Sequence, residues 1–173
     1  MKPQVKPSGS WPSEHWKIAD VARGAVQIIQ TAYDSTTQEF YWVQKSPANK
    51  GRQQIWRHSI VDDQTTLFHP EFDAETKVRA WYGGGSLVVG CGMVAASNMQ
   101  GLYILPKNDN DPIPLTPASD TLGWADGVMD ITRNRIVSVC EDIAQGVQRP
   151  VYSIRGVSLT PSDKIQELVA GHS

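Results

Sequence analysis

The sequence predicts an all-β fold: a partial β-propeller of about three four-stranded antiparallel blades, after a short N-terminal helical or irregular segment. Short segments rich in β-branched and aromatic residues recur between turn residues, and twelve of them divide into three groups of four. An aromatic residue returns as Trp56, Tyr103 and Tyr152, at intervals of 47 and 49 residues. This period is typical of a propeller blade, whereas a β-sandwich has no reason to repeat in fours.

Residues 1–24 form a leader that precedes the repeats, and residues 25–173 form the partial propeller. The leader is rich in proline and serine, and Ser13 is placed to cap a short helix that contains Trp16 and Ile18. It lacks the continuous apolar region of a secretory signal. We therefore expect a cytoplasmic protein.

The first blade is predicted over about 25–70, with the strands "AVQIIQTAY", "EFYWVQ", "QIWRHSIV" and "TTLFHP". The second covers about 84–117, with "SLVVG", "MVAAS", "GLYIL" and "PIPLTP". The third covers about 123–170, with "DGVMDI", "RIVSVCE", "VYSIRGVSL" and "KIQELVA". Ser162 is a possible helix cap before the last segment, so local propensity there favours a helix, but the repeat requires a strand.

Three blades do not close a ring, because propellers need roughly four to eight. An open stack exposes unpaired strand edges and apolar blade faces. We therefore expect the chain to be part of a longer protein, or to associate with other copies through its open blade edges.

Composition excludes several partners and cofactors. The 173 residues carry a net charge of −2, so the sequence lacks the excess of basic residues that is typical of proteins that bind nucleic acid or an anionic membrane. Cys91 and Cys140 are expected to be buried free thiols, since no zinc or redox spacing is present. The four histidines have no mutual metal spacing. The loop "NDNDP" lacks the remaining ligands of a calcium site, so we expect neither metal nor cofactor.

Three consecutive glycines, Gly83, Gly84 and Gly85, follow the aromatic pair Trp81 and Tyr82. Neither phosphate-binding glycine pattern is met, and a strand follows the run. We expect a structural turn in which backbone passes close to backbone. The later "GCG" is predicted to be a tight hairpin turn, and the strand aromatics are interpreted as packing between blades.

Several ordered motifs resemble a known family. They are "KVRAWYGGGSLVV", "PLTPASDTLGWADGVMDITRNRIVSVCEDI" and "VYSIRGVSLTPSDKIQELVAGHS". They are similar to the N-terminal propeller of prolyl oligopeptidase-family serine peptidases, in the acylaminoacyl-peptidase and dipeptidyl-aminopeptidase-like branch. The similarity extends over nearly the whole chain from about Trp11.

The resemblance implies a seven- or eight-bladed propeller that caps an α/β-hydrolase domain cutting short peptides. The G-x-S-x-G nucleophile motif of that domain does not occur in this sequence, so no catalytic residue is predicted here. The expected role is to gate access to that hydrolase domain, with the domain and the remaining blades as partners. The alternative is a non-catalytic binding or assembly module.

The resemblance also yields candidates for substrate binding. Relatives carry His-Glu before the tyrosine of the glycine run, whereas this sequence has Ala80 and Trp81, so any role of that glutamate is lost. Trp81 and Tyr82 can still form an aromatic wall. Glu141 and Asp142 match the family pattern as a carboxylate pair for a peptide amino terminus. A turn capped by aspartate is the alternative for this pair.

Overall fold

The computed structural model describes residues 25–78, 84–108, 110–144, 150–161 and 165–171. The predicted N-terminal helix therefore lies outside the described residues. The described part is almost entirely β-structure, and it contains no helix long and apolar enough to cross a membrane.

Each of the three sheets is a four-stranded antiparallel meander in which neighbours in the sequence are neighbours in the sheet. The first blade contains β1 (Gln27–Asp34), β2 (Glu39–Lys45), β3 (Gln53–Ser59) and β4 (Gln64–Phe68), with a 3₁₀ turn η2 (Pro47–Asn49). The second contains β5 (Leu87–Gly90), β6 (Met93–Ser97), β7 (Leu102–Ile104) and β8 (Ile113–Pro114). The third contains β9 (Leu122–Asp130), η3 (Ile131–Arg133), β10 (Arg135–Asp142), β11 (Val151–Ser158) and β12 (Ile165–Ala170).

These sheets confirm the predicted fold class, a partial propeller of three four-stranded antiparallel blades. The segment at Ile165–Ala170 is a strand, as the repeat required. Tertiary pairing with β11 thus outweighs its local preference for a helix.

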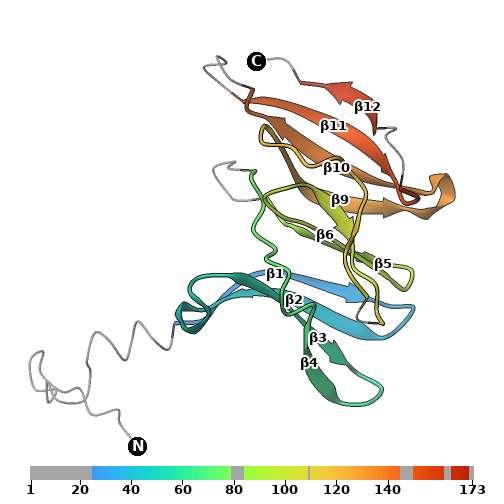
Figure 1. Cartoon of the computed structure of the whole chain (residues 1–173). Helices are drawn as coiled ribbons and strands as arrows, with labels where there is room; N and C mark the ends of the chain where they lie inside the picture. The colour runs from blue at the N-terminus through green and yellow to red at the C-terminus, as the bar shows by residue number, and fades with distance from the viewer. Residues whose placement is uncertain (1–24, 79–83, 109, 145–149, 162–164, 172–173) are drawn as a thin grey trace, which may run out of the picture.

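The blades are stacked one on another (Figure 1), and their first strands lie side by side, because β1 contacts β5 and β5 contacts β9. The second blade is covered on both faces. Leu87 and Ala96 point into a core shared with the first blade, while Val88 and Ala95 point into a core shared with the third. Successive strand residues face opposite sides, so a sheet buried on both faces needs continuous apolar strands. "SLVVG" and "MVAAS" have this pattern.

Polar side chains join the first two blades at both ends of the β1–β5 contact. The Gln30 amide donates to the carbonyl of Leu87 at 2.8 Å and accepts from its N–H at 2.8 Å. At the other end, the buried Asp34 carboxylate accepts from the N–H of Gly92 at 2.7 Å. Burial tends to raise the pKa of Asp34, but this bond and the one from Thr36 hold the pKa below its ordinary value.

A second polar connection centres on Glu39, whose carboxylate accepts from Lys107 of the second blade, Thr37 and Tyr41. Arg57 lies 3.7 Å from the other carboxylate oxygen. Burial tends to raise the pKa of Glu39, but these partners, with Lys107 foremost, hold it below its ordinary value.

The prediction that both cysteines are buried is wrong for Cys91. Cys140 is buried, but Cys91 is exposed, because it occupies the two-residue hairpin turn between β5 and β6. That turn has positive φ at Cys91 (53°) and Gly92 (79°), a combination that suits the twist of a hairpin, so "GCG" is a tight turn as predicted.

The aromatic repeat is only partly a packing repeat. Trp56 and Tyr103 lie on the blade face turned away from the following blade, and Trp56 stacks on Trp42 at a centroid distance of 6.1 Å. Tyr152 lies on the opposite face of its blade and is 40% exposed. Among these three aromatics, only Tyr103 therefore packs between described blades, since Trp56 and Tyr152 lie on the outer faces of the first and third blades. For Trp56 and Tyr152, packing against a neighbouring blade remains a prediction.

Candidate functional site

The glycine run leads into β5 at the end of the stack where the first strands begin. Trp81, Tyr82 and Gly83 lie outside the described residues, as does Ala80. Gly84 and Gly85 are described, and a Cβ on Gly84 would overlap Ala125 of the third blade. A Cβ on Gly85 would lie 2.7 Å from the Gln30 amide of the first blade. Gly84 is therefore required by the close approach of the third blade, whereas a side chain at position 85 would displace the Gln30 amide from its place beside β5.

The backbone of Gly85 is held by Asp126, which the sequence interpretation did not assign to any role. The N–H of Gly85 donates to the Asp126 carboxylate at 2.7 Å, and its carbonyl accepts from the N–H of Asp126 at 2.8 Å. Asp126 has a φ of 51° beside an irregularity in the β9–β10 pairing. Gly85 and Asp126 each lie in one of the quoted motifs, but neither motif shows that the two residues meet, because the contact depends on a bulge and on a second blade.

A cavity of about 330 Å³ lies beside Gly84. Its lining comes from the starts of β1 and β3, the connection between the first two blades, and the turn after β6: Ile29, Gln53, Glu75, Thr76, Lys77, Val78, Gly84 and Met99. Thr76 and Lys77 are engaged, because they donate to the carbonyls of Trp124 and Ser119. Glu75 is exposed and has no ion pair among the described residues, so the cavity presents a carboxylate to an incoming cation.

Glu141 and Asp142 lie at the end of β10, which is the same end of the stack. Glu141 is 2% exposed, and its carboxylate accepts from the Tyr152 hydroxyl at 3.4 Å. Burial and the Glu141 carboxylate together raise the pKa of Tyr152 above its ordinary value. Asp142 accepts from the N–H of Ala144 at 3.0 Å, so it caps the turn that follows the strand. Binding of a peptide amino terminus by this pair remains a prediction.

The structure brings this strand end near the cavity. Glu141 is paired with Gly123 across the β9–β10 ladder. A Cβ on Gly123 would lie 3.0 Å from the backbone nitrogen of Val78, which lines the cavity. Within the described part of the chain, no three metal-ligating side chains come together. The arrangement can accommodate a small polar or cationic group, and no catalytic set is assembled among the described residues.

No family model matches the sequence, and no curated protein matches it. Among the solved structures that match is a puromycin-hydrolyzing peptidase from Mycobacterium tuberculosis, with 28% identity and a TM-score of 0.78 over 99% of this chain. Another is a puromycin hydrolase mutant complexed with PGG, with 24% identity and a TM-score of 0.78 over 96% of this chain. The chain spans 28% of the length of each.

Proposed function

We propose that this chain, whose fold matches the propeller portion of prolyl oligopeptidase-family peptidases, gates substrate access to a serine-peptidase active site. The active site itself would belong to an α/β-hydrolase domain outside these 173 residues. The similarity to a peptidase over 99% of the chain carries this proposal. The substrates would be short peptides, or aminoacyl compounds such as the puromycin that the neighbours hydrolyse.

The end of the stack where β1, β5 and β9 begin is the face that we propose turns toward the hydrolase domain. It carries the cavity beside Gly84, and the Glu75 carboxylate lies in its lining. The carboxylate would attract the ammonium group of a short peptide. Trp81 and Tyr82, just before Gly84 in the sequence, would add an aromatic wall.

The test compares the gene product that contains these residues with the 173-residue chain alone. We expect a fluorophosphonate probe to label the former and not the latter, with peptide amide hydrolysis following the same pattern. In the active protein, Glu75→Gln should raise KM about two- to fivefold for a substrate with a free amino terminus and leave kcat unchanged, because an exposed charge contributes little.

Asp120→Asn is a matched control for Glu75→Gln, since Asp120 is an exposed acid that does not line this cavity. Absence of label from the complete gene product would contradict the proposal. Turnover by the 173-residue chain that a serine-directed inhibitor blocks would contradict the assignment of the chemistry to another domain.

A second candidate function is a non-catalytic binding or assembly module. The observation that favours it is a row of apolar side chains across the outer face of the third blade, formed by Val139, Ile154 and Val169. They line a groove of about 220 Å³. A module would cover this face with a second copy or another protein. Light scattering distinguishes the candidates, because a module gives a closed oligomer of defined mass, whereas a peptidase segment taken alone gives no such oligomer.

A further inference from the structure

The first and third blades each turn one sheet face to solvent. They lie at opposite ends of the stack (Figure 1), and the second blade covers only the inner face of each. On the outer face of the third blade, Ile154 and Val169 are paired across β11 and β12. On the outer face of the first blade, Tyr33 and Phe40 are paired across β1 and β2. All four side chains are more than a third exposed, so both ends of the stack present large apolar groups.

Each of these pairs belongs to a longer apolar row. On the first blade, Phe40 is followed on the same face by Trp42, which stacks on Trp56 with ring centroids 6.1 Å apart. On the third blade, Ile154 is paired with Val139 of β10. The solvated face of an antiparallel sheet is normally polar. Contiguous apolar rows on both outer faces therefore indicate that both are covered in the assembled protein.

The contacts inside the chain show how two such faces meet. The first blade packs on one face of the second blade, and the third blade packs on the other, with β1, β5 and β9 side by side. The blades thus meet head to tail, with the forward face of one against the backward face of the next. Among the described residues, the forward face of the third blade and the backward face of the first blade remain uncovered. A second copy of the chain offers the complement of each.

The number of blades limits the number of copies that can close a ring. Each copy contributes three sheets, and propellers close with about four to eight blades. Two copies bring six blades, whereas three copies bring nine, which lies outside that range. A head-to-tail contact that is repeated until it returns to its start gives a closed ring without free ends. Two copies therefore satisfy both outer faces at once.

Two such contacts would bury enough surface for a stable dimer. With about 4.8 Å between strands and about 3.3 Å per residue, four strands of about seven residues cover about 400 Å² on one face. Each contact covers two faces, so a ring with two contacts buries about 1,600 Å² in total. Stable protein–protein interfaces bury about 1,200–2,000 Å². A single contact of about 800 Å² falls below that range, so the closed ring is favoured over an open pair.

We propose that two copies of this chain assemble head to tail into a six-bladed ring. In each contact, Ile154 and Val169 of one copy pack against Phe40 and Trp42 of the other, and the apolar surface removed from water stabilises the dimer. This inference rests on the second candidate function, the binding or assembly module. In a longer peptidase chain, further blades of the same polypeptide would cover these two faces instead.

The test is light scattering of the 173-residue chain after size-exclusion chromatography. We expect twice the mass of one chain, which is 19.1 kDa. Ile154→Arg and Phe40→Arg should each raise the dissociation constant of the dimer by about a hundredfold or more, because each buries an unpaired charge in both contacts. Sensitivity to both substitutions distinguishes the ring from a face-to-face dimer, which would respond to only one of them.

Val61→Arg is the matched control, because Val61 is exposed in the hairpin turn between β3 and β4 and not on a sheet face. It should leave the dimer intact. Circular dichroism verifies that each variant keeps its strands, and Val169→Lys replaces Ile154→Arg if the latter does not fold. A dimer that survives either face substitution would overturn the ring and leave the module candidate standing. A wild-type mass of one chain, or of more than two, would overturn the ring as well, and a mass of one chain would leave a module only another protein as its partner.

Discussion

Replacing Gln30 with alanine should destabilise the contact between the first two blades at the point where their first strands meet. β5 is the edge strand of its sheet, so the N–H and carbonyl of Leu87 find no strand partner on that side. The Gln30 amide takes the place of a strand, with one bond to each group at 2.8 Å. Leu87 is fully buried, so alanine at position 30 leaves both groups without a partner.

The expected loss is larger than that of an ordinary surface hydrogen bond. A buried backbone group without a partner costs about 1–3 kcal/mol. Two such groups, with some water entering the half-buried space left by Gln30, give a loss of about 2–4 kcal/mol in the free energy of unfolding. With a slope of about 2 kcal/mol per molar of urea, the midpoint should fall by about 1–2 M.

The assay is urea unfolding followed by the fluorescence of the six tryptophans. Gln64→Ala is the matched control, because Gln64 is an exposed strand residue whose side chain makes no hydrogen bond with the described residues. We expect this control to change the midpoint by less than about 0.3 M. If Gln30→Ala lost no more stability than Gln64→Ala, the account of how the blades are joined would be refuted.

Three further predictions concern blade packing, thiol chemistry and pH. Gly127→Ala should lower stability by about 1–3 kcal/mol in urea unfolding, since its Cβ would overlap Val88 across the blade contact, whereas Gly90→Ala should be nearly neutral. Iodoacetamide at pH 8 should modify Cys91 alone in the folded protein, because burial raises the pKa of Cys140 to about 11; modification of both residues would contradict this. The pKa of Glu39 is lower in the folded protein than in the unfolded chain, so its carboxylate stabilises the fold at pH values above the unfolded pKa. This contribution to the free energy of unfolding is lost as the pH falls through the folded pKa. Glu39→Gln should therefore be less stable than wild type at pH 7, and the difference in urea midpoint should shrink toward pH 3.

The fold was predictable because strand segments and their period are local properties of the sequence. The continuous apolar strands "SLVVG" and "MVAAS" also indicate a sheet that is covered on both faces. The face of the sheet on which a residue lies is harder to predict from the sequence. It depends on whether the residue has an odd or an even place along the strand, and a bulge reverses that order. Tyr152 matches the repeat spacing, yet it lies on the opposite face from Trp56 and Tyr103, since β11 places Ser153 and Val157 toward the second blade.

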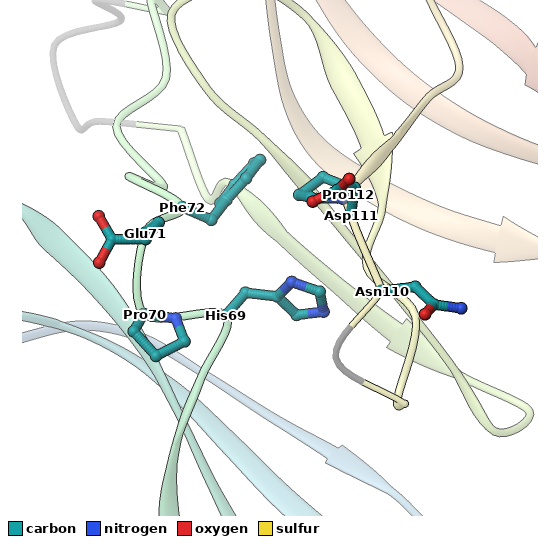
Figure 2. A pocket seen from close by; sticks show the side chains of 7 residues that line it. All are labelled: His69, Pro70, Glu71, Phe72, Asn110, Asp111 and Pro112. Carbon is teal, nitrogen blue, oxygen red and sulfur yellow. The ribbon is translucent and has the colours of Figure 1, made fainter.

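The candidate sites depend on contacts between residues far apart in the sequence. Gln30 meets Leu87, and Gly85 meets Asp126, across two different blade contacts. The cavity lined by His69, Phe72 and Asp111 likewise forms only where the turn after β4 meets the loop before β8 (Figure 2). A glutamine in a strand or an aspartate at a bulge carries no signal of these contacts in the sequence, so only the stacking of the blades reveals them.

The most direct test of the proposed role is the transcript sequence beyond the codon for Ser173. A propeller segment that gates a serine peptidase predicts further four-stranded repeats of roughly 50 residues and, beyond them, a G-x-S-x-G motif between a strand and a helix. A transcript that contains neither would contradict the gating role and favour the binding module.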